Sequence, residues 1–214
     1  MAPRLLSLLA PPLCWGCRAP ARLGEPLCGR CRLTLRRLPA EPVLLGGIPV
    51  WAAVSYEGAA RDLVRALKYR GAARVAEAMA AAMAACAPED VLPRGSPRAA
   101  LVPVPLHPAR LRRRGYDQAA MLAADLARRT GLPTAPVLER AGAATPQVGR
   151  GRSARLAGIS GTIRARARSA APELAVLVDD VVTTGATLSA CADALGRAGA
   201  GAVTAVAYAR TPGR

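Results

Sequence analysis

Two adjacent carboxylates, Asp179 and Asp180, follow the apolar run 176–178 and come directly before a turn rich in threonine. An ionised carboxylate can only accept hydrogen bonds, so the pair suits the hydroxyls of a sugar such as ribose, or a hard cation such as Mg²⁺. The pattern therefore predicts a site for a polyol at the end of a strand.

The turn after the aspartates has the composition of a phosphate-binding loop. In a tight turn that opens a helix, several backbone N–H groups point at one spot, where the helix dipole favours an anion. A Walker A loop does not fit, because its lysine is absent. The alternative is a buried strand and a capped helix without a ligand, which gives the aspartates no role. We expect a ligand to contact Asp179, Asp180, Val181, Val182, Thr183, Thr184, Gly185, Ala186 and Thr187.

The segments that must position these residues alternate between strands and helices. Apolar runs predict strands over 50–56 and 99–105, and helical spacing predicts helices over 58–69, 74–86 and 118–129, with a further helix after the threonine-rich turn. Such alternation is typical of an α/β fold with a parallel sheet.

Basic residues follow two of these predicted elements. An arginine-dense loop, 110–114, lies between the strand 99–105 and the next helix, which is the layout of a pyrophosphate-binding edge. Lys68 is the only lysine of the chain, and either a site that requires a compact ammonium or a surface position explains it. His107, the only histidine, is expected to be a loop or capping residue.

The segment 142–168 lacks periodicity and is rich in glycine and arginine. Its place before the phosphate loop favours a lid that closes over a polyanionic substrate, and a disordered insert is the competing interpretation. The arginines and glutamine concerned are Gln147, Arg150, Arg152, Arg155, Arg164, Arg166 and Arg168.

Four cysteines near the start form two Cys-x-x-Cys turns, Cys14 with Cys17 and Cys28 with Cys31. Two such turns can close a tetrahedron of thiolates around Zn²⁺, and the same ligand set also suits iron. Disulfides are not expected in a cytosolic chain. We predict a structural zinc site. Cys86 and Cys191 lie in alanine-rich helices and are predicted to be small buried apolar residues.

Charge and hydropathy bound the partners and the location. The net charge is +16 over 214 residues, and this basic excess favours an acidic ligand or partner. The apolar run 5–10 is too short for a signal peptide, and no stretch approaches the roughly 20 residues of a membrane span. We expect a cytoplasmic protein.

Together these motifs resemble the ComF family, whose namesakes take part in competence for DNA uptake. The resemblance covers nearly the whole chain. It rests on the four cysteines, the segments 67–69 and 102–108, Arg114-Gly115-Tyr116-Asp117-Gln118, Gln147 followed by Arg155, and the loop from Asp179 to Thr187. Where the family shows Arg-Gly-Phe-Asn-Gln, this chain has Tyr116 and Asp117, and Gly158 replaces a second asparagine.

The resemblance implies a type I phosphoribosyltransferase fold, a twisted and mainly parallel sheet with helices on both faces. An N-terminal helix and the zinc-binding segment are expected within 1–40, and the phosphoribosyltransferase-like domain within 41–214. The implied ligand is phosphoribosyl pyrophosphate (PRPP), bound with Mg²⁺. Asp179 and Asp180 then hold the ribose, residues 183–187 hold the 5′-phosphate, and Lys68 and Arg114 become candidate pyrophosphate contacts.

Three functions are compatible with these expectations. The first is a phosphoribosyltransferase that acts on a nitrogen acceptor, whose identity no sequence feature gives. The second is a PRPP-dependent regulator without turnover. The third is an accessory protein that binds single-stranded DNA and works with the competence machinery, which the zinc segment and basic charge favour and the scarcity of aromatic residues disfavours.

Overall fold

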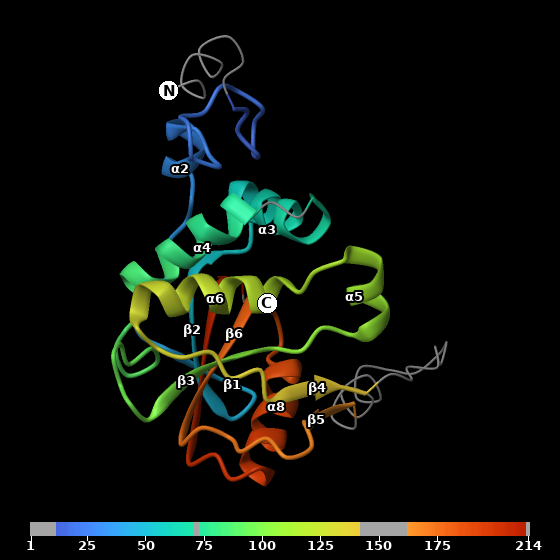
Figure 1. Ribbon diagram of the computed structural model, residues 1–214. Helices are drawn as coiled ribbons and strands as arrows, with labels where there is room; N and C mark the ends of the chain where they lie inside the picture. Colours follow the sequence, from blue (N-terminus) through green and yellow to red (C-terminus); the bar gives the residue numbers. More distant parts are fainter. Residues whose placement is uncertain (1–11, 71–72, 142–161, 213–214) are drawn as a thin grey trace.

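A five-stranded sheet forms the centre of the molecule (Figure 1). The computed structural model describes residues 12–70, 73–141 and 162–212. The strand order is β1-β2-β7-β6-β3, in which β2, β7, β6 and β3 run parallel and the edge strand β1 is antiparallel to β2. The strands are β1 (Val43–Leu45), β2 (Ile48–Ser55), β3 (Ala99–Pro103), β6 (Leu174–Val182) and β7 (Ala202–Arg210). The predicted α/β class with a mostly parallel sheet is confirmed.

Helices cover both faces of this sheet and bury it. The helices α3 (Gly58–Arg70), α4 (Ala73–Cys86) and α6 (Gln118–Thr130) pack over one face, and α8 (Ala186–Arg197) packs on the other. Alternate residues of β6 join different cores: Val176 packs with the first group, and Leu177 packs with α8. Since both faces are buried, the strands are nearly continuous apolar runs.

The arginine-dense segment is a helix, α5 (Pro108–Arg114), where the sequence analysis expected a loop. His107 caps it, because its Nδ1 accepts a hydrogen bond from the Ala109 N–H at 3.2 Å, and proline occupies the first helical position. Gly115 ends the helix in the left-handed conformation, with φ of 77°. The expectation that His107 is a capping residue is thereby confirmed.

A two-stranded antiparallel sheet, β4 (Leu138–Arg140) with β5 (Ile163–Ala165), lies beside α8. Residues 142–161 lie outside the described residues, and with them most of the predicted lid. The described end of that segment belongs to the fold: Arg164 pairs with Glu139 at 2.8 Å, and Arg166 donates to the Leu138 carbonyl at 3.3 Å.

The cysteine segment lies at the end of the molecule next to α3 and α4 (Figure 1). Its described part contains one short helix, α2 (Gly29–Leu33), and residues 1–11 lie outside the described range. The chain then joins the body alongside β2, where the Leu38 N–H donates to the Ala53 carbonyl and the Ser55 N–H donates to the Arg36 carbonyl. Within the described residues, no helix has the length and apolar character needed to cross a membrane.

Candidate functional site

The candidate site lies where the parallel strands β3 and β6 end. The connection that leaves β3 crosses one face of the sheet through α6, and the connection that leaves β6 crosses the other face through α8. Adjacent strands whose connections leave in opposite directions create a crevice outside their carboxyl ends, which is where open α/β sheets bind ligands.

The unequal lengths of β3 and β6 leave the paired aspartates without a strand partner on one side. The last residue of β3, Pro103, pairs with Val178, so β6 has no β3 partner from Asp179 onward. Asp179 still pairs with Ala207 of β7 on the other side, and the strand continues to Val182. The sequence predicted the aspartates at the end of the strand. They lie two and three residues before the strand ends at Val182, at positions where β3 has already ended.

Asp180 forms the central ion pair of this site. Its side chain is only 6% exposed, and its Oδ1 lies 2.8 Å from the Lys68 Nζ at the end of α3. Asp179 lies beside it, with Oδ1 accepting from the Asp180 backbone N–H at 2.7 Å. The structure thus brings Lys68, the only lysine of the sequence, to the aspartates.

Burial and mutual repulsion change how the two carboxyl groups titrate. Burial and the neighbouring charge of Asp180 raise the pKa of Asp179 to about 8. Burial also raises the pKa of Asp180, against the opposing effect of Lys68 and Arg114. The pair therefore holds one proton to a higher pH than two ordinary carboxyl groups would. A cation or a polyol that binds here would replace the water contacts that burial removes.

The threonine-rich turn lines a cavity beside Asp179. Residues 183–185 connect β6 to α8, which begins at Ala186, and the Thr184 hydroxyl accepts from the Ala186 N–H at 3.4 Å. The turn and the first residues of α8 line a cavity of about 120 Å³ together with Asp179. The turn opens directly into a helix, as predicted, and we refer to this cavity as the cradle.

Two glycines keep a neighbouring turn against this cradle. Gly46 and Gly185 both adopt positive φ, 63° and 77°, and a Cβ on Gly46 would lie 2.7 Å from the Gly185 carbonyl oxygen. The turn between β1 and β2 therefore supports the threonine-rich turn from the far edge of the sheet, a contact that the sequence did not indicate.

The larger cavity, of about 190 Å³, gathers most of the predicted residues. Lys68, Arg114, Asp179, Asp180, Val181 and Thr187 line it, and residues 183–186 line the adjoining cradle. The sequence analysis gave no role to Asp117, Gln118 or Arg140, which also line the larger cavity. Gln118 and Asp117 stood within the quoted motif, but no sequence signal distinguished Arg140 from the other arginines.

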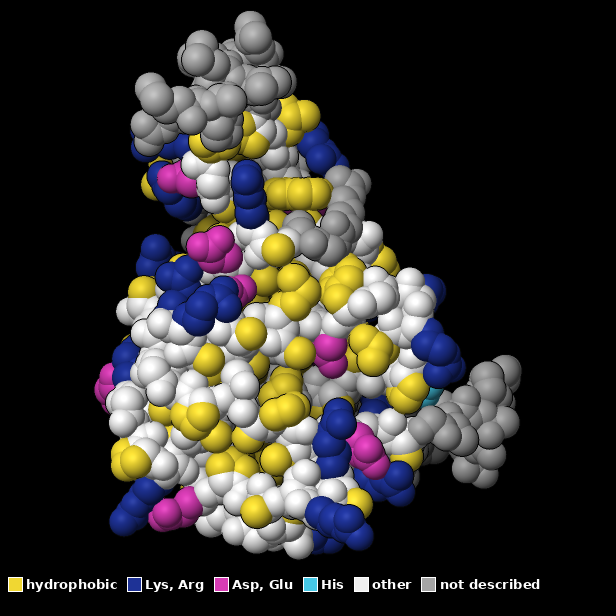
Figure 2. All heavy atoms as spheres, viewed as in Figure 1, with side chains coloured by type: hydrophobic (Ala, Val, Ile, Leu, Met, Phe, Trp, Pro, Cys, Tyr) yellow, Lys and Arg dark blue, Asp and Glu magenta, His cyan; other side chains and the backbone are white. Residues whose placement is uncertain are grey.

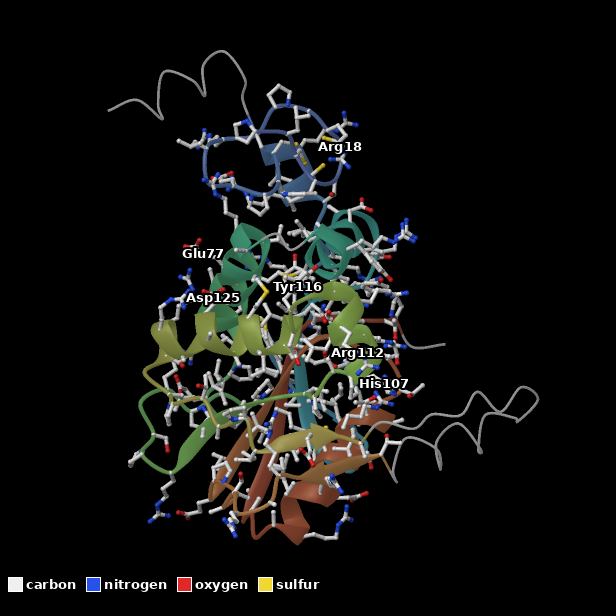
Figure 3. All side chains as sticks on the ribbon, turned by 45° about the vertical axis from the view of Figure 1, so that its right-hand side comes forward. Arg18, Glu77, His107, Arg112, Tyr116 and Asp125 are labelled. Carbon is white, nitrogen blue, oxygen red and sulfur yellow. The ribbon has the colours of Figure 1, made fainter. Side chains whose placement is uncertain are left out.

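Contacts between α3 and the segment after α5 hold the basic side of this cavity. The Tyr116 hydroxyl donates to the Leu67 carbonyl at 2.7 Å, and the Arg114 guanidinium lies over the Tyr69 ring, 5.3 Å from its centroid. In Figure 3, Tyr116 lies between α3 and α6. These contacts place Lys68 and Arg114 on the same side of the pocket.

The four cysteines of the N-terminal segment come together as predicted. Their Sγ atoms all lie within 4.8 Å of one another, and those of Cys17 and Cys28 are 3.6 Å apart. Ligands at about 2.3 Å from a tetrahedral Zn²⁺ are themselves about 3.8 Å apart, so the cluster fits a structural zinc ion. Cys191 is buried as predicted, but Cys86 is exposed at the end of α4, where its Sγ accepts from the Arg37 Nη1.

The thiols differ in how readily they ionise. Although burial opposes ionisation of Cys14, backbone N–H donors from Cys17, Cys28 and Gly16 lower its pKa to about 6. Burial, hydrogen bonds with the other thiols and the charge of Cys14 raise the pKa of Cys31 to about 12. One thiolate forms easily and hinders the next, so a divalent cation is needed to compensate four of them.

The chain matches no model of a protein family and no curated protein sequence.

Proposed function

We propose that this protein binds PRPP with Mg²⁺ and transfers its phosphoribosyl group to a nitrogen acceptor, as a protein of the ComF kind with a type I phosphoribosyltransferase fold. The observation that carries the proposal is the continuity of the two cavities, which share Asp179, Val181 and Thr187. A ligand that spans them presents a phosphate to the cradle and a sugar to the aspartates.

Each part of PRPP has a matching group in the site. The cradle at residues 183–187 offers backbone N–H groups and threonine hydroxyls to the 5′-phosphate. Asp179 and Asp180 accept hydrogen bonds from the ribose 2′ and 3′ hydroxyls. Lys68 and Arg114 supply positive charge for the pyrophosphate.

The transfer needs no covalent intermediate on the protein. The bond between C1 of the ribose and pyrophosphate breaks, and pyrophosphate leaves with the electron pair. The lone pair of the acceptor nitrogen forms the new bond to C1, and that nitrogen loses a proton to solvent. Lys68 and Arg114 stabilise the charge that grows on the leaving group.

Two metals accompany the proposal. Mg²⁺ bound with PRPP would neutralise part of the pyrophosphate charge, and the nearby acceptors are Asp179 and Asp180. Zinc held by Cys14, Cys17, Cys28 and Cys31 would have a structural role in the N-terminal segment.

Titration calorimetry with PRPP and Mg²⁺ tests binding. Asp180→Asn should weaken it by about tenfold or more, because a charge-assisted hydrogen bond contributes on the order of 1.5–3 kcal/mol. The matched control is Asp193→Asn, an exposed carboxylate on α8. Absence of PRPP binding to the wild type, or equal affinity in both variants, would contradict the proposal.

Release of pyrophosphate in the presence of PRPP, Mg²⁺ and a panel of nitrogen compounds separates an enzyme from a regulator. A transferase releases pyrophosphate only when an acceptor is present. Tight binding of PRPP without release by any compound of the panel supports a PRPP-dependent regulator.

A second candidate function, binding of single-stranded DNA in competence, is favoured by the groove between the cysteine segment and α3. Trp15, Arg18, Arg65 and Tyr69 line it, and the Arg18 guanidinium lies 5.7 Å from the Trp15 ring centroid. Aromatic rings with nearby cations are typical of single-strand sites. Fluorescence anisotropy of a labelled oligonucleotide should show salt-dependent binding that Trp15→Ala weakens. No binding at low salt would exclude this function.

A further inference from the structure

The larger cavity contains more positive charge than the paired aspartates and a pyrophosphate group require. Besides Lys68, three arginines line it: Arg110, Arg114 and Arg140. They come from different elements, since Arg110 and Arg114 belong to α5 and Arg140 ends β4. Figure 2 shows dark-blue side chains over the surface of the body, but three arginines that line one cavity need their own explanation.

These four cations divide into two groups. Lys68 forms an ion pair with Asp180 at 2.8 Å, and the charge of Arg114 opposes the rise in the pKa of Asp180. Arg110 and Arg140 act on each other: burial first, and then the charge of Arg110, lower the pKa of Arg140. Arg140 is half-buried and Arg110 is exposed, and two guanidinium groups that repel each other favour an anion between or beside them.

The second pair has no carboxylate partner in the described part of the chain. Among the described residues, neither Arg110 nor Arg140 forms an ion pair, and the buried Nε of Arg140 has no hydrogen-bond partner. Gln118 on the same wall is only 4% exposed, and its buried Nε2 also has no partner within the described residues. A buried donor without an acceptor destabilises the free protein, so such groups commonly mark the position of a ligand.

The wall next to these donors is apolar or formed by backbone. Val104, Pro105 and Leu106 follow β3 and line the same cavity. A ligand in this part of the cavity therefore meets two guanidinium groups and one amide donor, next to the three residues that follow β3. A small organic acid has this combination of chemical features.

We propose that Arg110, Arg140 and Gln118 form the acceptor subsite and that the acceptor is a nitrogen compound with an acidic group, a carboxylate or a phosphate. The acidic group binds the two arginines, and an oxygen of the acceptor accepts from Gln118. This inference rests on the proposed function, because it assigns the second substrate of that same site. The size of the cavity favours a small molecule over a nucleic-acid strand.

Calorimetry with inorganic phosphate as the probe tests the subsite. Protein saturated with PRPP and Mg²⁺ should bind phosphate at one further saturable site, and Arg140→Gln and Arg110→Gln should each weaken this binding by about tenfold or more, because a charge-assisted contact is lost. The control is Arg112→Gln, an exposed arginine of α5 that does not line the cavity (Figure 3). Arg110→Gln keeps the test valid if Arg140→Gln, which alters a half-buried residue, fails to fold.

The outcomes distinguish this subsite from the proposed function. PRPP binding to the wild type without a further phosphate site, or with one that Arg110→Gln leaves unchanged, overturns the subsite alone. If PRPP does not bind, the same titration without PRPP decides whether the two arginines bind an anion. Displacement of phosphate by an oligonucleotide but by no small acid would assign the arginines to DNA, and so would also overturn the subsite.

Pyrophosphate release tests the class of acceptor. Nitrogen compounds in matched acidic and neutral forms, such as orotate and uracil, should differ, with turnover confined to acids. Arg110→Gln should raise KM for an active acid with little change in KM for PRPP. Turnover of a neutral acceptor that Arg110→Gln leaves unchanged would contradict the proposal.

Discussion

The cysteine segment and the α/β body are stabilised by different means within one chain. Between residues 12 and 40, only Cys14 and Leu27 are buried. The body, by contrast, buries two large apolar clusters, one on each face of its sheet, and Cys14 and Leu27 of the segment join the first of these clusters. We therefore expect the segment to depend on metal–thiolate bonds, whereas the body depends on removal of apolar surface from water.

Removal of the metal should have the largest effect and should be confined to the segment. Cys14→Ser is expected to abolish stoichiometric zinc and to unfold residues 12–35, because metal binding supplies roughly 10–16 kcal/mol in small zinc modules. Elemental analysis and limited proteolysis measure both effects. The melting temperature of the body should change little.

Cys86→Ser is the control for that experiment, since this thiol is exposed and lies outside the cluster. A wild-type protein that holds less than about half an equivalent of metal, with its thiols intact, would refute the zinc site. Global unfolding on loss of zinc would instead show that the two regions form one cooperative unit.

Removal of a buried side chain from the body should have the reverse effect, a less stable body with zinc still bound to the segment. Leu177 in β6 is fully buried, and Leu177→Ala should lower the free energy of unfolding by about 2–5 kcal/mol, while zinc remains bound without denaturant. Urea unfolding followed by circular dichroism measures this change. The control is Leu44→Ala, whose side chain is 75% exposed, and a similar loss in both variants would contradict the burial argument.

Because of the raised pKa of Asp179 in the candidate site, the body should become less stable as pH rises. The pKa of Asp179 is about 8 in the folded chain against an ordinary value of 3.8, so the unfolded chain releases this proton first. Stability is therefore lost between about pH 4 and 8, by up to about 1.4 kcal/mol for each pH unit.

Asp179→Asn removes that titration. Relative to wild type, the variant should gain stability progressively as pH rises from 5 to 8, and the two proteins should converge in slope above pH 8. Urea unfolding at several pH values tests this expectation. Parallel pH profiles for the two proteins would show that Asp179 titrates as an ordinary carboxyl group.

Surface charge should matter least. The Arg98–Glu173 pair, at 3.2 Å, joins two side chains that are 73% and 61% exposed. Glu173→Gln should change the free energy of unfolding by less than about 0.5 kcal/mol, because water screens such pairs. A larger loss in thermal or urea unfolding would mean that this edge of β6 contributes more than burial suggests.

The motifs that carry chemistry were the most predictable part of the chain. The spacing of the cysteines and the paired aspartates before a threonine-rich turn are local patterns, and the structure forms the cluster and the cradle from them. The strand β7 was not predicted, because alternating alanine and valine give little propensity signal. The helix α5 was interpreted as a loop since three successive arginines obscured the capping signal of His107 and Pro108.

Contacts between distant segments could not be predicted from the sequence. Lys68 meets Asp180 only because α3 ends above the carboxyl end of β6, and Arg140 reaches the same cavity from a separate small sheet. Cys86 was wrongly predicted to be buried, because an alanine-rich helix does not show from its composition which face its last turn exposes. Tertiary placement decides these cases.

Gly46 in the turn between β1 and β2 and Gly185 in the threonine-rich turn each limit the substitutions that the other position can accept. A side chain at position 46 would meet the Gly185 carbonyl oxygen, and one at position 185 would meet Gly46 and Leu45. Neither position can accept a larger residue unless the other turn moves as well. In homologous sequences, these two positions should therefore vary together or remain glycine. The hairpin of β1 and β2 lines neither cavity of the candidate site, yet its contact with the threonine-rich turn restricts its sequence.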